Sequence, residues 1–335
     1  MATQNSANIP RKGNSAILAR HRFAIFTASV TFLLIIAGGI VTGREAGLSV
    51  PDWPLSYGQW MPPMQGNILY EHSHRMIAAF VGLLTLVLAV WTWRKEERRW
   101  VRRLGGIAFL VVVSQGILGG IGVLYFLPLP ISMGHASLAQ IFFCLMVTMA
   151  LVTSPRWSAA RTAASSEPVS REKDNGTPQL RHLAVAASGA ILLQTVLGAA
   201  LRHSGEGIVP HVMGAVLVFV AAFWTCFRVF YGYPQQWNMV RAALILMALL
   251  FLQFLLGTGS YMIRLVAQDA PQPTLPLVAL TTAHVAAGAL TLAISVLLTL
   301  ETHRALETPT MALGNSKQPG KVPSKVIVAE ATLSK

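Results

Sequence analysis

Long apolar stretches separated by short polar segments dominate the pattern of this chain. A helix that crosses a bilayer needs about 20 mostly apolar residues, and eight stretches suit this role. They are Phe23–Gly43, Met76–Trp93, Leu104–Phe126, Ile131–Val152, Leu183–Leu201, Ile208–Phe230, Ala242–Ile263 and Leu275–Leu300. None contains Asp, Glu or Lys, and the single Arg inside them is Arg228. The pattern predicts an all-α polytopic membrane protein with eight transmembrane helices.

Composition and charge agree with a membrane location and predict an orientation. The 335 residues are 53% hydrophobic and 12% charged, whereas a soluble domain has about 25% charged residues. The net charge of +13 comes from basic residues in both terminal tails and in alternate loops, such as 94–103. Because Lys and Arg mark cytoplasmic loops, we predict a bacterial plasma membrane protein with both termini in the cytoplasm. The basic excess is therefore a topology signal, and no nucleic-acid partner is expected.

An internal repeat divides the chain into two halves. The pattern Gln-x-x-Leu-Gly occurs on the third, fifth and seventh stretches, at Gln115–Gly119, Gln194–Gly198 and Gln253–Gly257. We predict two four-helix-bundle repeats related by an axis along the membrane normal. The parts are a cytoplasmic tail (1–22), the first repeat (23–153), a linker (154–182), the second repeat (183–302) and a disordered tail (303–335). The glycines serve close helix packing, make room for a flat ligand, or do both.

Four histidines lie at matching places in this repeat. His74, His135, His211 and His284 each lie toward the outer end of an inward-running stretch. Ionisable residues inside a membrane are costly and usually functional. Paired imidazoles in an apolar bundle suit haem and suit zinc less well, because zinc takes four ligands. We predict two haem sites near the outer face. One pairs His74 with His135, and the other pairs His211 with His284.

A carboxylate and a long loop distinguish the first half from the second. Glu71 precedes His74 by three residues, so the two share a face if this segment is helical. We interpret Glu71 as a catalytic base or as a carboxylate favoured by the helix dipole. The loop Arg44–Tyr70 is rich in Trp, Tyr and Pro and is read as a lid or as an interfacial aromatic belt. Three arginines near this boundary are candidate contacts for haem propionates. These are Arg44, Arg75 and Arg202.

These residues together resemble the haem A synthase family. The resemblance is carried by Thr42-Gly43-Arg44, by Gly47-Leu48-Ser49-Val50-Pro51-Asp52-Trp53-Pro54-Leu55 and by Glu71-His72-Ser73-His74-Arg75. It implies an enzyme that oxidises the C8 methyl group of haem O to the formyl group of haem A for cytochrome oxidase. Many members have a cysteine pair in the first outer loop, whereas this chain has Val50 and Ser56 at the matching positions. The two cysteines of this chain, Cys144 and Cys226, lie in apolar stretches instead.

The resemblance also implies a role for each site residue. Glu71 is the catalytic carboxylate, His74 and His135 hold the substrate haem, and His211 and His284 ligate a haem b cofactor. The implied partners are haem O as substrate, haem O synthase, and an electron donor or acceptor chain. The bilayer surrounds the protein, and a homo-oligomer is left open.

Two other functions compete with this reading. A di-haem electron-transfer protein needs the same four histidines but neither Glu71 nor a lid. A transporter built on parallel repeats needs a polar path at mid-membrane, for which the glutamines of the repeated pattern, Gln115, Gln194 and Gln253, are candidates.

Overall fold

A computed structural model describes residues 11–157, 172–267 and 270–307. Eight helices in these ranges are long and apolar enough to cross a membrane, which confirms the predicted all-α polytopic class. The helices are α1 (Arg11–Gly43), α2 (Gly66–Lys95), α3 (Arg99–Leu124), α4 (Leu129–Val152), α6 (Leu180–Ser204), α7 (Ile208–Gly232), α8 (Trp237–Val266) and α9 (Leu275–Ala305). Two short parallel strands, β1 (Glu172–Lys173) and β2 (Leu306–Glu307), pair with each other.

Several helices extend beyond the apolar stretches that predict them. Helix α1 begins at Arg11 rather than at Phe23, and α2 begins at Gly66 rather than at Met76. Hydropathy reports only the part of a helix that suits hydrocarbon, whereas backbone hydrogen bonding continues into the polar boundary. The early start of α2 is important for the site, because it places Glu71 and His74 on one helix. Within the predicted tails and linker, residues 1–10, 158–171 and 308–335 lie outside the described residues.

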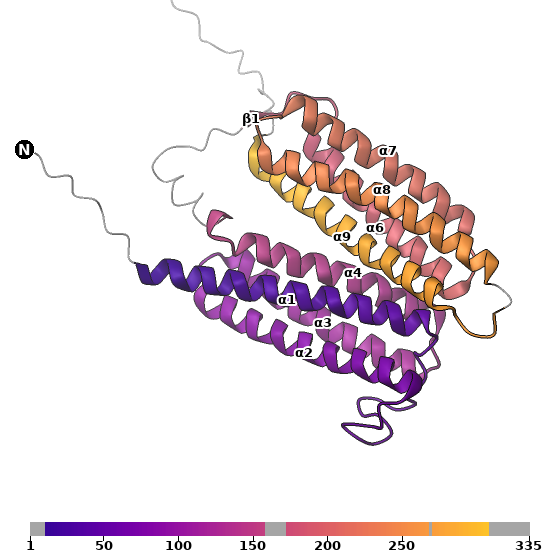
Figure 1. The fold of residues 1–335 in the computed structure, drawn as a ribbon. Coiled ribbons are helices and arrows are strands. Elements are labelled where there is room, and N and C mark those ends of the chain that lie inside the picture. The colour runs from indigo at the N-terminus through magenta and orange to yellow at the C-terminus, as the bar shows by residue number, and fades with distance from the viewer. Residues whose placement is uncertain (1–10, 158–171, 268–269, 308–335) are drawn as a thin grey trace, which may run out of the picture.

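The helices form two four-membered rings, one on each side of the linker (Figure 1). In the first ring α1 and α3 each contact α2 and α4, and in the second ring α6 and α8 each contact α7 and α9. The rings meet where α1 and α4 face α6 and α9. The contacts thus divide the eight helices into two groups of four, and the predicted domain boundaries and the repeat relating the halves stay predictions.

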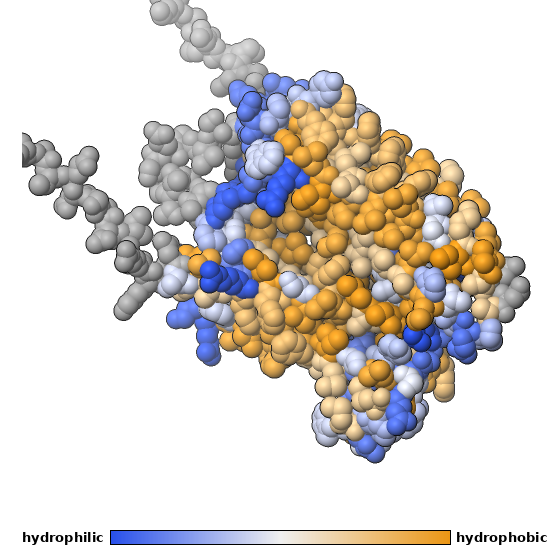
Figure 2. All heavy atoms as spheres, viewed as in Figure 1, coloured by the Kyte–Doolittle hydropathy of each residue, from blue (hydrophilic) through white to orange (hydrophobic). Residues whose placement is uncertain are grey.

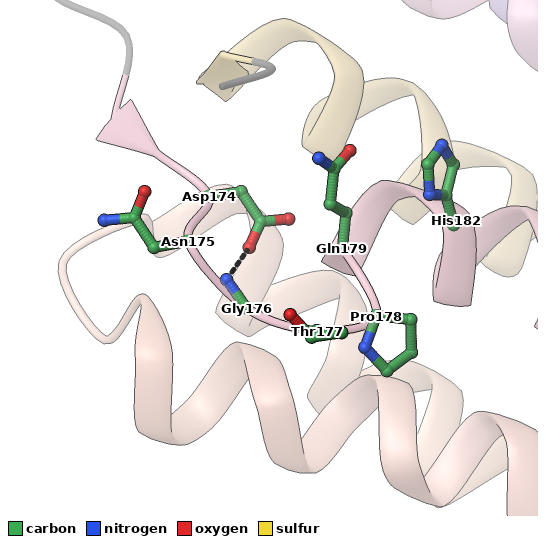
Figure 3. A pocket seen from close by; sticks show the side chains of 7 residues that line it. All are labelled: Asp174, Asn175, Gly176, Thr177, Pro178, Gln179 and His182. Carbon is green, nitrogen blue, oxygen red and sulfur yellow. Dashed lines mark hydrogen bonds between the residues drawn. The ribbon is translucent and has the colours of Figure 1, made fainter. Parts of the chain in front are cut away.

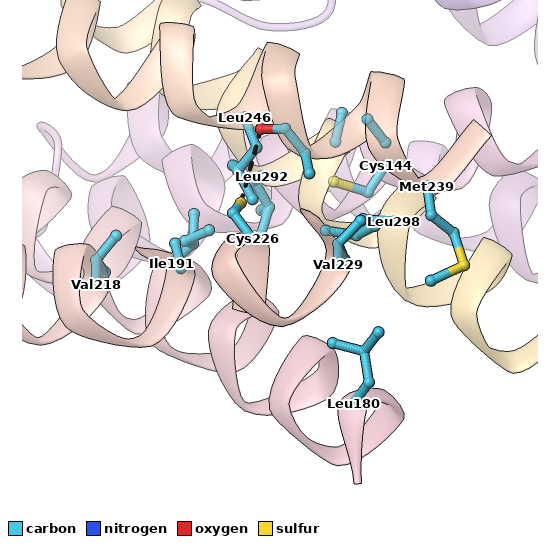
Figure 4. Close-up of a cluster of buried hydrophobic side chains, with 14 of the residues drawn as sticks. Cys144, Leu180, Ile191, Val218, Cys226, Val229, Met239, Leu246, Leu292 and Leu298 are labelled. Atoms are coloured by element: carbon cyan, nitrogen blue, oxygen red, sulfur yellow. Dashed lines mark hydrogen bonds between the residues drawn. The ribbon is translucent and has the colours of Figure 1, made fainter. Parts of the chain in front are cut away.

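Apolar packing joins the two rings, and apolar side chains also cover the outside of the helices. The cluster in Figure 4 includes Val218, Leu246 and Leu292 of the second ring, and it continues to Ile35 and Phe143 of the first. Cys144 and Cys226 are buried within it as free thiols. Figure 2 shows apolar residues along the flank of the molecule and polar residues at both ends. This distribution is what a surrounding bilayer requires.

Glu96 joins three elements at the end of the first ring that lies nearest the linker. Its carboxylate lies 2.7 Å from the Arg20 guanidinium of α1 and 2.7 Å from the Nε atom of Arg98. Arg98 also donates to the main-chain carbonyl of Val152, at the end of α4. Burial alone raises the pKa of Glu96, but the hydrogen bonds from Arg98 and the charge of Arg20 outweigh it, and the pKa is lowered.

Replacing Glu96 with alanine should destabilise the protein by about 3–5 kcal/mol, because it leaves the buried Arg20 charge unpaired. Thermal unfolding in detergent at neutral pH measures the effect, and the exposed Glu97→Ala is the matched control. Because the pKa of Glu96 is lowered on folding, its contribution is present above the unfolded-state pKa. It is lost as the pH falls through the folded-state pKa. Equal stability of the two variants would contradict this role.

The C-terminal part of the predicted linker is anchored to the second ring. The buried carboxylate of Asp174 accepts hydrogen bonds from the Tyr233 hydroxyl at 2.8 Å and from the Leu180 amide at 2.5 Å. Figure 3 shows Asp174 and its bond to the Gly176 amide at an open pocket of about 330 Å³ that extends to His182. Burial and the neighbouring carboxylate raise the pKa of Tyr233. These contacts fix residues 174–180 of the chain against α7.

Candidate functional site

The four predicted histidines lie at one end of the two rings. Each is in the first third of its helix, namely α2 for His74, α4 for His135, α7 for His211 and α9 for His284. These four helices run in the same direction, and the long loop 44–65, which we call the outer loop, lies at the same end. The structure therefore places His74 and His135 in the first ring, and His211 and His284 in the second.

The imidazoles of His211 and His284 face each other between the helices of the second ring. Their centroids are 6.4 Å apart, and their planes are inclined by 74°. An imidazole nitrogen binds a first-row metal at roughly 2 Å, so two imidazoles on opposite sides of one iron have ring centres about 6 Å apart. The observed separation of the centroids fits one haem iron between the two imidazoles. Among the described residues, no group of three or more His, Cys, Asp or Glu side chains is placed to hold a bare metal ion.

Each of the four histidines packs against a glycine of the preceding helix. A Cβ atom added at the glycine would lie 3.1–3.4 Å from the imidazole Cε1. The pairs are Gly38 with His74, Gly119 with His135, Gly198 with His211, and Gly257 with His284. Three of these glycines close the Gln-x-x-Leu-Gly pattern. The glycines thus make room for the imidazoles themselves, which is closer packing than the sequence could specify.

The glutamines of the same pattern bind the same histidines. The Nε2 amide donates to the main-chain carbonyl of the histidine at 2.9–3.0 Å in all three cases. The pairs are Gln115 with His135, Gln194 with His211, and Gln253 with His284. Gln194 Nε2 also lies 3.2 Å from His211 Nδ1. The Nε2 groups are therefore engaged by helix backbone, whereas the Oε1 atoms of Gln115 and Gln194 have no hydrogen-bond partner among the described residues.

Unpaired imidazole nitrogens test whether the histidines fit a ligand. The Nδ1 atoms of His74, His135 and His284 are buried without a hydrogen-bond partner among the described residues. Each of these Nδ1 atoms lies beside the glycine of the preceding helix, 3.6–3.9 Å from the position of an added Cβ. Nε2 is therefore the ring nitrogen that these imidazoles could offer to a haem iron, which takes histidine as an axial ligand. The spacing of the second pair fits such a ligand.

Glu71 holds the outer loop against α2. Its side chain is almost fully buried, and its two oxygens accept from the Val50 amide at 2.9 Å and from Arg75 at 2.6 Å. Arg75 donates in addition to the carbonyls of Asp52 and Leu55. The helical segment assumed for Glu71 and His74 is confirmed. Sequence reasoning missed the contact of Glu71 with the Val50 amide, because Val50 lies in the outer loop 21 residues earlier.

The outer loop packs against α2 and α3 at the end of the first ring where His74 and His135 lie. Gly120 of α3 faces the Trp53 indole so closely that an added Cβ would lie 2.6 Å from the ring. Asp52 stabilises the loop by accepting from the amides of Gly58 and Tyr57, which lowers the pKa of its carboxyl. The loop is therefore docked on the first ring, and both the lid and the aromatic-belt interpretations stay predictions.

His72 is a buried histidine of α2 that contacts the outer loop. It is only 6% exposed, and its Nδ1 lies 2.8 Å from Ser56 Oγ. The reason is the early start of α2, which brings His72 under the outer loop. Val50 and Ser56 of the outer loop are both buried, and each contacts the segment 71–75.

The three arginines predicted as propionate contacts all have protein partners. Arg44 stacks over the Tyr70 ring at 4.7 Å. Arg202 reaches from α6 into the first ring and donates to the Gly39 carbonyl at 2.9 Å. The Nη atoms of Arg75 bind the outer loop and Glu71. Propionate binding by these residues stays a prediction, and for Arg75 it would compete with the loop.

The fold and the paired histidines together define a polytopic membrane protein with two histidine pairs at one end of its helices. Comparison with known proteins then specifies the family. The model of the COX15-CtaA family, described as cytochrome oxidase assembly protein, matches residues 21–69 and 64–300. The chain belongs to this family, which confirms the resemblance recognised in the sequence.

Curated relatives carry the name Heme A synthase. One from Symbiobacterium thermophilum is 31% identical over 55% of this chain and 60% of its own length. One from Exiguobacterium sp. is 26% identical over 70% of this chain and 73% of its own length. A third, from Lysinibacillus sphaericus, is 38% identical over 31% of this chain and 34% of its own length. The chain thus spans less than two thirds of the length of several of the relatives that it matches.

Proposed function

We propose that this protein is a membrane haem A synthase, which oxidises the C8 methyl group of haem O to a formyl group. The observation that carries the proposal is the asymmetry of the two histidine pairs. The long outer loop is bound to Glu71, His72 and Arg75 around His74, whereas the connection between α6 and α7 is only 205–207. One site is thus built for enclosed chemistry and the other for electron transfer. The proposal includes haem b at His211 and His284, and membership of the family supports it.

The residues of the first site have separate tasks in this proposal. Haem iron supplies the one-electron and oxygen chemistry when it is bound. His74 and His135 hold the substrate, and the docked outer loop excludes water from it. Glu71 lies one helical turn from His74. We assign to its carboxylate the role of accepting a proton or stabilising positive charge. Its two bonded oxygens keep it in one orientation.

The orientation and partners belong to the same proposal. The excess of basic residues at the linker end supports a cytoplasmic location for that end, and the histidines then lie near the outer face. Haem O synthase is the expected source of substrate. An electron donor or acceptor chain is required, since methyl oxidation changes the oxidation state of the substrate.

Pigment analysis after co-expression with a haem O source tests the function. Extraction and chromatography should yield haem A or hydroxylated haem O only when this chain is present, and cells carrying an empty vector provide the control. A purified protein with a Soret band that yields neither product would overturn the enzyme in favour of the di-haem electron-transfer protein. The absence of any Soret band, with haem available, would overturn both.

A further inference from the structure

The repeated Gln-x-x-Leu-Gly pattern forms the same local contact in three places. A glutamine and the glycine four residues later lie on one face of a helix, and both meet one histidine of the next helix. We infer that Gln115, Gln194 and Gln253 are positioning residues for His135, His211 and His284, acting with Gly119, Gly198 and Gly257. The inference rests on the proposal that these histidines hold haem, and it adds what sets their geometry.

The two contacts control different parts of the histidine. The glutamine amide binds the main-chain carbonyl at 2.9–3.0 Å and so fixes the helix at that residue. The glycine lets the imidazole lie against the neighbouring backbone, where any Cβ would displace it by a few tenths of an ångström. A ligand histidine needs its ring orientation set by such surrounding groups. A polar amide inside a membrane helix is costly. Its presence at three equivalent places, each time bonded to a histidine, therefore points to a function.

His74 is the exception among the four histidines. Its glycine, Gly38, is in place, but the residue four positions earlier is Leu34, which has no donor. The neighbours of His74 on α2 bind the outer loop instead, through Glu71, His72 and Arg75.

The second pair is therefore clamped on both sides, and the first pair on one side only. This difference suits a permanently held cofactor at His211 and His284. It also suits an exchangeable haem at His74, whose position depends on the docked outer loop.

Haem transfer to excess haem-free myoglobin tests the glutamine contact in the purified protein. In Gln194→Met the length of the side chain is kept and the donor is lost. We expect the haem of the second pair to leave roughly 10–100-fold faster, as for other residues that orient a metal ligand. The electron paramagnetic resonance spectrum of the ferric form should change as well, since it reports the orientation of the imidazoles. Gln140→Met is the matched control, because Gln140 is buried and forms no hydrogen bond to a histidine within the described residues.

A glycine variant tests the ring contact independently. Gly198→Ala places a Cβ 3.2 Å from His211 Cε1, whereas Gly189→Ala on the same helix meets nothing within 4 Å. Only Gly198→Ala should change the spectrum and the rate of haem loss. If Gln194→Met does not accumulate, Gln253→Met and Gly198→Ala decide the question with the same measurements.

The outcomes separate the inference from the proposed function. Unchanged rates and spectra in Gln194→Met and Gly198→Ala would overturn the positioning role and leave the enzyme proposal intact. Equal changes in Gln140→Met would also overturn the positioning role. A wild-type protein that binds no haem would overturn the proposed function, and the inference with it.

Discussion

Replacing His284 with alanine should remove the tightly held haem of the second pair. The imidazole of His284 lies 6.4 Å from that of His211, a separation that fits two axial ligands of one iron, and in the proposed site alanine leaves one axial position without a ligand. The haem content of the purified protein, measured as haemochrome per protein, should fall by about one equivalent. His211→Ala should have the same effect, because the two residues serve one site.

A control histidine at the other end of α9 makes this result specific. His303 is exposed and contacts the Thr299 carbonyl of its own helix. His303→Ala should therefore keep the full haem content. A His284→Ala protein that retains its haem and its spectrum would show that the second pair is not the ligand set.

Replacing Glu71 with alanine should abolish turnover while the second haem stays bound. General acid–base residues contribute typically about 10²–10⁴-fold to a rate, so the yield of haem A should fall by that order. The haem content at His211 and His284 should be unchanged, because Glu71 lies in the other ring. Pigment chromatography and the haem spectrum of the same preparation measure both quantities. Full activity of Glu71→Ala would reject the catalytic assignment.

A second variant separates chemistry from loop anchoring at Glu71. In Glu71→Gln the amide oxygen still accepts from Val50, whereas the negative charge opposite Arg75 is lost. An inactive Glu71→Gln protein with a protease-resistant outer loop supports proton transfer. An active Glu71→Gln with an inactive Glu71→Ala assigns the residue to holding the loop. Ser73→Ala, between Glu71 and His74, is the control for changes to this turn of α2.

The difference between the halves links these two predictions. Both rings place a pair of histidines at the same end. In the first ring a long loop binds the segment 71–75 beside His74, whereas the matching connection of the second ring is only 205–207. Ile208 stands three residues before His211, where the first ring has Glu71 before His74. Loss of haem and loss of turnover should therefore respond to different residues, which is how a cofactor site and a substrate site differ.

The sequence by itself determines the membrane fold and the candidate ligands. Membrane insertion depends on runs of consecutive apolar residues, so all eight helices follow from local pattern alone. The four histidines are conspicuous because ionisable residues are scarce in such runs. The repeated Gln-x-x-Leu-Gly pattern is visible as well, and it marks the residues that later prove to contact histidines.

Only the tertiary structure decides what those residues touch. The sequence leaves open whether Gly119, Gly198 and Gly257 face a helix, a ligand or a side chain, because a helix of uniform hydropathy gives no signal for its rotation. The contact of Glu71 with Val50 and the burial of His72 depend on a loop that returns over α2. Hydropathy reports transfer into lipid and is nearly the same for every rotation of these helices, whereas hydrogen bonds and close packing distinguish one rotation from all others.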